Sequence, residues 1–118
     1  MKVISPSAHG VLDYVTVVAF ALAPTVVGFS GLPATICYVL AAVHLVLTLV
    51  TAFGAGVAKL VPFHLHGRIE LVVSLVLIVL PWLLGFAGVL AARWFFVGAG
   101  VVIFLVWLLT AYSGPRAA

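Results

Sequence analysis

Four long apolar stretches make up most of this chain and limit the folds that it can adopt. They cover residues 6–30, 33–55, 62–87 and 89–112. An α-helix needs about 20 apolar residues to cross the hydrocarbon core of a bilayer, and each stretch is long enough. With 67% hydrophobic residues and a mean hydropathy of +1.48 over 118 residues, a soluble domain could not bury the apolar surface. We therefore predict an all-α membrane protein with four transmembrane helices in a single domain, residues 1–118.

The chain also repeats itself at an interval of 57 residues. Over the 30 positions that follow Met1, eight residues recur unchanged in the second copy, and most of these are glycine, proline or polar residues. We divide the chain into repeat 1, residues 1–57, and repeat 2, residues 58–118. Because each repeat holds two helices, both copies must run in the same direction. The prediction is two parallel-repeated helical hairpins, related by a pseudo-twofold axis along the membrane normal.

The few charged residues predict how the protein is oriented. Lys2, Lys59, Arg68 and Arg116 fall on one side of the four-helix arrangement, and Arg93 alone falls on the other. The positive-inside rule then places both termini and the central link in the cytoplasm. A net charge of +3 spread over separate segments does not form a nucleic-acid surface, so the expected partner is the lipid bilayer. The small residues at 98–100 allow a neighbouring helix to approach, within the bundle or in a homo-oligomer or larger membrane complex.

Proline and glycine-phenylalanine recur at matching places in the first helix of each hairpin. This arrangement resembles the SPW-repeat membrane proteins, a small bacterial family with a Ser-Pro-Trp motif in the first of two helices per unit. The corresponding triplets here are Ala23-Pro24-Thr25 and Leu80-Pro81-Trp82, so only the second keeps both proline and tryptophan. The resemblance covers nearly the whole chain and implies two packed hairpins in a bacterial plasma (inner) membrane. It brings no catalytic residues with it.

The acidic residues, Asp13 and Glu70, each follow a histidine by four positions, and the histidines are His9 and His66. Residues four apart share a helix face. If the first and third helices meet at the axis, the two pairs form a site near the cytoplasmic face that suits Zn²⁺, and more loosely Mn²⁺ or Fe²⁺. Gly10 and Gly67 are expected to let the two helix backbones approach. Alternatively, each histidine pairs only with its own acid, which the helix dipole stabilises.

His44 is a second candidate and is predicted to lie deeper. It belongs to a stripe that we expect to face other helices, and the members of the stripe are Cys37, Ala41, His44, Thr48 and Thr51. We expect His44 to lie level with about Phe20, where it can donate to the carbonyl that Pro24 leaves free. The alternatives are a cofactor-binding role as a haem ligand and a partial proton relay toward Asp13. A haem b between His9 and His66 is also geometrically allowed.

The sequence carries no positive sign of an enzyme. It has no phosphate-binding loop, no nucleophile beside a base and no setting for a reactive cysteine. We expect a non-enzymatic membrane protein that binds a ligand, most simply a divalent metal ion. The alternatives are an electron-transfer protein that holds haem b and an oligomeric transporter or proton-handling component.

Overall fold

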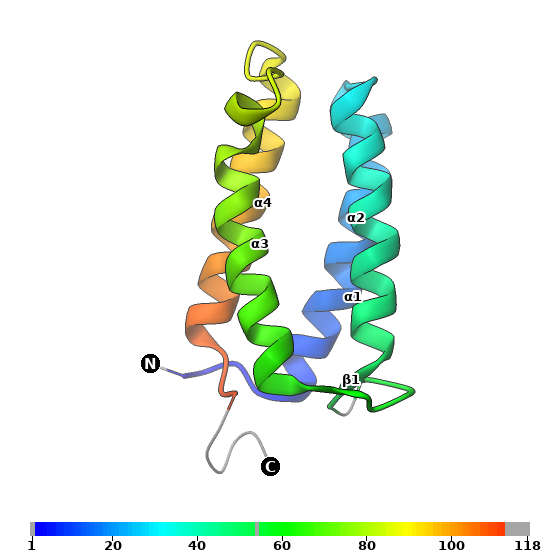
Figure 1. Cartoon of the computed structure of the whole chain (residues 1–118), viewed down its shortest axis with the longest axis vertical. Coiled ribbons are helices and arrows are strands. Elements are labelled where there is room, and N and C mark those ends of the chain that lie inside the picture. The colour runs from blue at the N-terminus through cyan, green and yellow to red at the C-terminus, as the bar shows by residue number, and fades with distance from the viewer. Residues whose placement is uncertain (1, 54, 113–118) are drawn as a thin grey trace.

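The computed structural model describes residues 2–53 and 55–112, which form two helical hairpins that lie side by side (Figure 1). The first hairpin contains α1 (Pro6–Ala23), the short π-helix η1 (Pro24–Gly28) and α2 (Leu32–Leu49). The second contains α3 (Phe63–Leu83) and α4 (Leu90–Leu109). All four long helices are apolar and long enough to cross a membrane, which confirms the predicted four-helix arrangement.

Proline and serine determine where the first helix begins and where it changes. Ser5 caps α1 by accepting a hydrogen bond from the Ala8 amide at 3.2 Å. Pro24 carries no N–H to donate, and α1 passes into η1 at this residue. Pro62, expected as the first residue of the third helix, instead lies in the extended region just before α3 begins.

The turn of each hairpin depends on glycine. Gly28, Gly31 and Gly85 have φ values of 91°, 68° and 78°, which side chains with a Cβ rarely adopt. Two of these glycines turn the first hairpin and the third turns the second.

The second helix of each repeat ends beside the beginning of the other repeat. The short strand β1 (Thr51–Ala52), after α2, pairs in parallel with β2 (Val61–Pro62), before α3. In the same way Ile4, before α1, forms a parallel bridge with Thr110, after α4. Both bridges lie at the end of the bundle where the chain passes from one hairpin to the other, which we call the link end (Figure 1).

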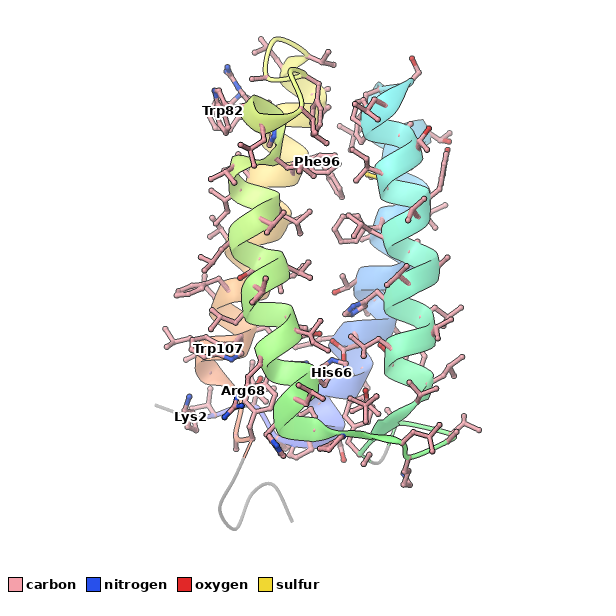
Figure 2. All side chains as sticks on the ribbon, in the orientation of Figure 1. Lys2, His66, Arg68, Trp82, Phe96 and Trp107 are labelled. Carbon is pink, nitrogen blue, oxygen red and sulfur yellow. The ribbon has the colours of Figure 1, made fainter. Side chains whose placement is uncertain are left out.

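The far end of the bundle from the link is held by an aromatic core. The rings of Phe20 and Phe95 meet edge to face with their centroids 5.4 Å apart, and Phe96 is fully buried between Phe86 and Phe95. Figure 2 shows Phe96 and Trp82 near this far end, and Lys2 and Arg68 near the link end. The basic residues therefore gather as predicted, except for Arg116, which lies outside the described residues.

Candidate metal centre

Two histidines and two carboxylates meet between the hairpins near the link end. His9 and Asp13 come from α1, and His66 and Glu70 come from α3. One ligand atom from each residue lies within 4.8 Å of the others, and each residue is at most 3% exposed. Figure 2 shows His66 pointing into this space. The sequence predicted which residues share a helix face, and the structure confirms that the two pairs converge.

Each imidazole faces both carboxylates rather than only its own. His9 Nε2 lies 3.2 Å from Asp13 Oδ1 and 2.9 Å from Glu70 Oε2. His66 Nε2 lies 3.0 Å from Asp13 Oδ2 and 2.9 Å from Glu70 Oε1. Ligand atoms around a tetrahedral Zn²⁺, with bonds of about 2.0–2.1 Å, lie about 3.3 Å apart. The nitrogen–oxygen distances are close to this value, and one ligand atom from each group lies within 4.8 Å of the others, so the four groups can be drawn around one ion by small side-chain shifts.

A threonine fixes the proton on His66. His66 Nδ1 lies 2.6 Å from Thr51 Oγ1, and the Thr51 hydroxyl donates to the Leu47 carbonyl at 2.6 Å. A hydroxyl has one proton to donate, and here the carbonyl takes it. Thr51 Oγ1 must therefore accept from His66, so Nδ1 carries the hydrogen.

The same arrangement fixes His9 from the other repeat. His9 Nδ1 lies 2.9 Å from Thr110 Oγ1, and Thr110 donates to the Val106 carbonyl at 2.5 Å. In the neutral form of each histidine, the lone pair then lies on Nε2, which is the atom directed at the carboxylates. A lone pair on Nε2 that faces a carboxylate oxygen at about 3 Å is repelled by that oxygen, unless a cation or an added proton lies between the two atoms. Outer hydrogen bonds of this kind are typical of metal-ligating histidines.

Two of the central atoms have no hydrogen bond. Within the described part of the chain, His9 Nε2 and Asp13 Oδ2 are buried and lack a partner in acceptable hydrogen-bond geometry, although the two groups are close to others. Leaving such groups unsatisfied costs about 1–3 kcal/mol each. An ion at the centre would satisfy both.

Three aromatic side chains cover the centre at the link end. The centroid of the Phe63 ring lies 5.1 Å from that of Phe53 and 4.7 Å from that of Tyr112. The Phe63 ring also meets the His9 ring edge to face, with centroids 5.4 Å apart, and the centroids of Phe53 and His66 are 5.7 Å apart. We call Phe53, Phe63 and Tyr112 the aromatic plug. It separates the centre from the nearer aqueous face.

The two glycines beside the histidines make room for side chains of the plug and of the link. We predicted that Gly10 and Gly67 let helix backbones approach, which is wrong. A Cβ on Gly67 would lie 2.6 Å from the Tyr112 ring, and one on Gly10 would overlap the Ala55 side chain and lie 3.3 Å from Phe53. Side chains, rather than a helix backbone, occupy the space that the missing Cβ atoms leave. Burial, together with the charge of Glu70, raises the pKa of the Tyr112 phenol, so this ring stays neutral.

His44 also reaches the centre, although it was predicted to lie deeper, level with Phe20. Its Nε2 atom lies 3.4 Å from Asp13 Oδ1 and 3.5 Å from Glu70 Oε1. The turn between η1 and α2 is centred on residue 30, so His44 lies opposite Thr16. That position is one helical turn nearer to Asp13 than the predicted position opposite Phe20. Within the described residues, no hydrogen bond joins His44 to the Phe20 carbonyl.

The stripe that includes His44 does face the other helices. Cys37, Thr48 and Thr51 are fully buried, Ala41 is buried and His44 is 16% exposed. The Thr48 hydroxyl donates to the His44 carbonyl of its own helix at 2.8 Å. This proton is therefore engaged in the backbone, which disfavours Thr48 as a member of a proton relay.

The geometry favours a single ion over haem. The rings of His9 and His66 have centroids 5.6 Å apart, and the carboxylates of Asp13 and Glu70 contact both Nε2 atoms. These carboxylates occupy the space that a porphyrin would need between the two imidazoles.

Thr110 and the aromatic plug were not predicted as parts of the site. A signal was present, because Thr51 and Thr110 each follow an apolar segment and stand 59 positions apart. This interval differs by two from the 57-residue spacing of the histidines. When the two repeats are aligned at an interval of 57, Thr51 therefore does not fall on Thr110, and the match between them is not seen.

No protein-family model, curated protein or solved structure matches this chain. The resemblance to the SPW-repeat family stays a prediction. Any functional conclusion therefore depends on the geometry of the centre.

Proposed function

We propose that this chain is a small integral membrane protein that binds one divalent transition-metal ion through His9, Asp13, His66 and Glu70. The observation that carries the proposal is the orientation of the two imidazoles. Each presents Nε2 to both carboxylates, while a threonine holds Nδ1. A divalent cation with two neutral histidines and two carboxylates has no net charge. Such a centre can be buried without an uncompensated ion.

The ligand set restricts the metal. Two nitrogen and two oxygen ligands suit Zn²⁺, whereas Fe²⁺ and Mn²⁺ are favoured when further nitrogen or oxygen ligands are added. The second oxygen of each carboxylate can supply such a ligand, because both oxygens of Asp13 and of Glu70 face the imidazoles. We therefore retain Zn²⁺, Fe²⁺ and Mn²⁺ as candidates, with Zn²⁺ best matched by the four central residues.

We further propose that the two hairpins are related by a pseudo-twofold axis along the membrane normal. Two matching sets of contacts support this arrangement, since Thr51 of repeat 1 bonds His66 and Thr110 of repeat 2 bonds His9. The basic residues at the link end favour cytoplasmic termini in a bacterial inner membrane.

The metal content of the detergent-purified protein tests the proposal. After growth with added Zn²⁺, Fe²⁺ or Mn²⁺, we expect about one ion per chain by inductively coupled plasma mass spectrometry. The double variant His9→Ala, His66→Ala should lose it. His64→Ala is the matched control, because His64 is an exposed histidine on the same helix. Wild-type protein without metal after loading, or equal metal in the double variant, would sink the proposal.

A metal-free proton-handling site is the second candidate. Protons on both Nε2 atoms would also neutralise the carboxylates, at the observed distances of 2.9–3.2 Å. In this case added Zn²⁺ would neither bind nor raise the unfolding temperature. In liposomes, Asp13→Asn would instead change proton-coupled flux.

A further inference from the structure

A small cavity reaches the proposed metal centre from the side of α2 and α3. It measures about 60 Å³ and is lined mainly by aliphatic side chains, including Leu40, Val43, Leu47 and Val73. Its polar boundary is formed by His44 and the Glu70 carboxylate, together with the hydroxyl-bearing Thr16. The cavity therefore joins an apolar space to the ligand shell of the centre.

His44 has an unused hydrogen-bonding atom at this boundary. Its Nε2 atom is buried and, among the described residues, has no hydrogen-bond partner. The carboxylate oxygens of Asp13 and Glu70 are 3.4 Å and 3.5 Å away, beyond the usual range for an N–H···O bond. The imidazole is thus placed to bind something that the chain itself does not supply.

The opposite side of the centre lacks this group. A cavity of about 100 Å³ there reaches Asp13 and Glu70 and is bounded by Val102, Ile103 and Val106 of α4, and it shares Thr16, Glu70 and Ile103 with the first cavity. Ile103 follows His44 by 59 positions, the interval that also relates Thr51 to Thr110. Repeat 2 therefore carries an apolar side chain where repeat 1 carries an imidazole. Thr16 lines both cavities, but its hydroxyl donates to the Leu12 carbonyl, so among the described residues that line them His44, beside α2, is the one with a free ring nitrogen.

We propose that the metal ion takes a small uncharged ligand, of the size of a diatomic gas, from the cavity beside α2, and that His44 donates a hydrogen bond to it. This inference rests on the metal site proposed above. Apolar walls inside a membrane bundle disfavour an ion. The centre is already neutral, so an anionic ligand would leave a buried net negative charge.

The aromatic plug supports an approach from within the bundle. Phe53 and Phe63 are 6% and 8% exposed and cover the histidines at the link end. A ligand that dissolves in the bilayer would reach the centre without displacing these rings. We therefore expect the ligand to enter and leave through the cavity beside α2, and the aromatic plug to keep the metal from leaving at the link end.

Nitric oxide binding to the Fe²⁺-loaded protein tests the inference. Protein in detergent is loaded anaerobically, its iron content is measured, and nitric oxide is added while the electron paramagnetic resonance spectrum is recorded. Nitric oxide adds to a non-haem Fe²⁺ without breaking a bond and gives a spin-3/2 signal. We expect one nitric oxide per iron in the wild type. A chain that takes Zn²⁺ but no Fe²⁺, or an iron-loaded chain without the signal, would overturn the inference and leave the metal site standing.

Three variants locate the ligand. His44→Leu should keep its iron and bind nitric oxide about 3- to 10-fold more weakly, the effect of one lost hydrogen bond. Val73→Phe should block binding by filling the cavity beside α2. Val106→Phe should not, because Val106, which is also half-buried, lines the other cavity.

Loss of iron in His44→Leu would make His44 a metal ligand and overturn the inference. Equal binding in all variants, or a block only in Val106→Phe, would overturn it as well. Loss of iron in every chain would instead contradict the metal site.

Discussion

At the scale of single residues, two threonines decide which histidine atom faces the centre. Thr51 and Thr110 give their protons to their own helix carbonyls and so can only accept from Nδ1 of His66 and His9. Each threonine belongs to the repeat that does not carry its histidine. The hydroxyls therefore orient the imidazoles and also hold the two hairpins together at the link end.

Removing either hydroxyl should weaken metal binding without removing a ligand. We expect Thr51→Val or Thr110→Val to lower affinity for Zn²⁺ about 10- to 100-fold, as is typical of lost outer partners of ligating histidines. Competition with a chromophoric chelator measures the change. Thr35→Val is the matched control, because the Thr35 hydroxyl bonds only its own helix, at the Gly31 carbonyl. Affinity unchanged in both test variants would show that Thr51 and Thr110 do not orient the ligands.

The residue scale also shows how far the sequence predicts the site. His9, Asp13, His66 and Glu70 were identified because helical spacing fixes which side chains share a face. His44 was placed one turn too far from the centre, because its depth depends on where the turn lies. Spacing within one helix is a local property, whereas the level of a residue on a neighbouring helix depends on tertiary packing.

At the scale of helices, α3 and α4 approach closely at one glycine. A Cβ on Gly100 would lie 2.7 Å from the Ser74 carbonyl oxygen, and also 2.7 Å from Ile78 Cγ1. Gly98 has no atom within 4 Å of such a Cβ among the described residues, and it lines a cavity between α1 and α4. The predicted small-residue patch therefore contains one glycine that packing requires and one that it does not.

Alanine at these two positions should have opposite effects. Gly100→Ala should lower the free energy of unfolding by about 1–3 kcal/mol, because backbone must move to admit the methyl group. Gly98→Ala, two residues away on the same helix, should raise it by up to about 1 kcal/mol through helix propensity. Unfolding of the purified protein in mixed micelles measures both. Similar changes in the two variants would contradict the close approach at Gly100.

The helices were predictable because apolar segments about 20 residues long have few alternatives in a bilayer. Their ends were less predictable. The sequence gives no reason why Pro24 marks the change to η1 while Pro81 stays within α3. The pairing of β1 with β2 depends on contacts between repeats, which no pattern within one segment reveals.

At the scale of the whole molecule, the centre is one of the places where the two hairpins meet, together with the aromatic core at the far end and the backbone bridges at the link end. Its ligands come in equal number from α1 and α3, and the crossed threonines add the ends of α2 and α4. The centre lies near the link end, where Lys2 and Arg68 also lie (Figure 2). The orientation of the protein therefore determines which compartment is nearer to the proposed metal centre.

Cysteine labelling tests the proposed orientation. In a Cys37→Ala background, we place single cysteines by Ser30→Cys, in the first turn, and Ala58→Cys, in the link, since both positions are exposed. With cytoplasmic termini, a membrane-impermeant maleimide should label Ser30→Cys in intact bacterial spheroplasts. Ala58→Cys should react only after permeabilisation, because the basic residues of the link end remain on the cytoplasmic side. The reverse pattern would place the centre near the outer face, so that its nearest metal pool would be extracytoplasmic.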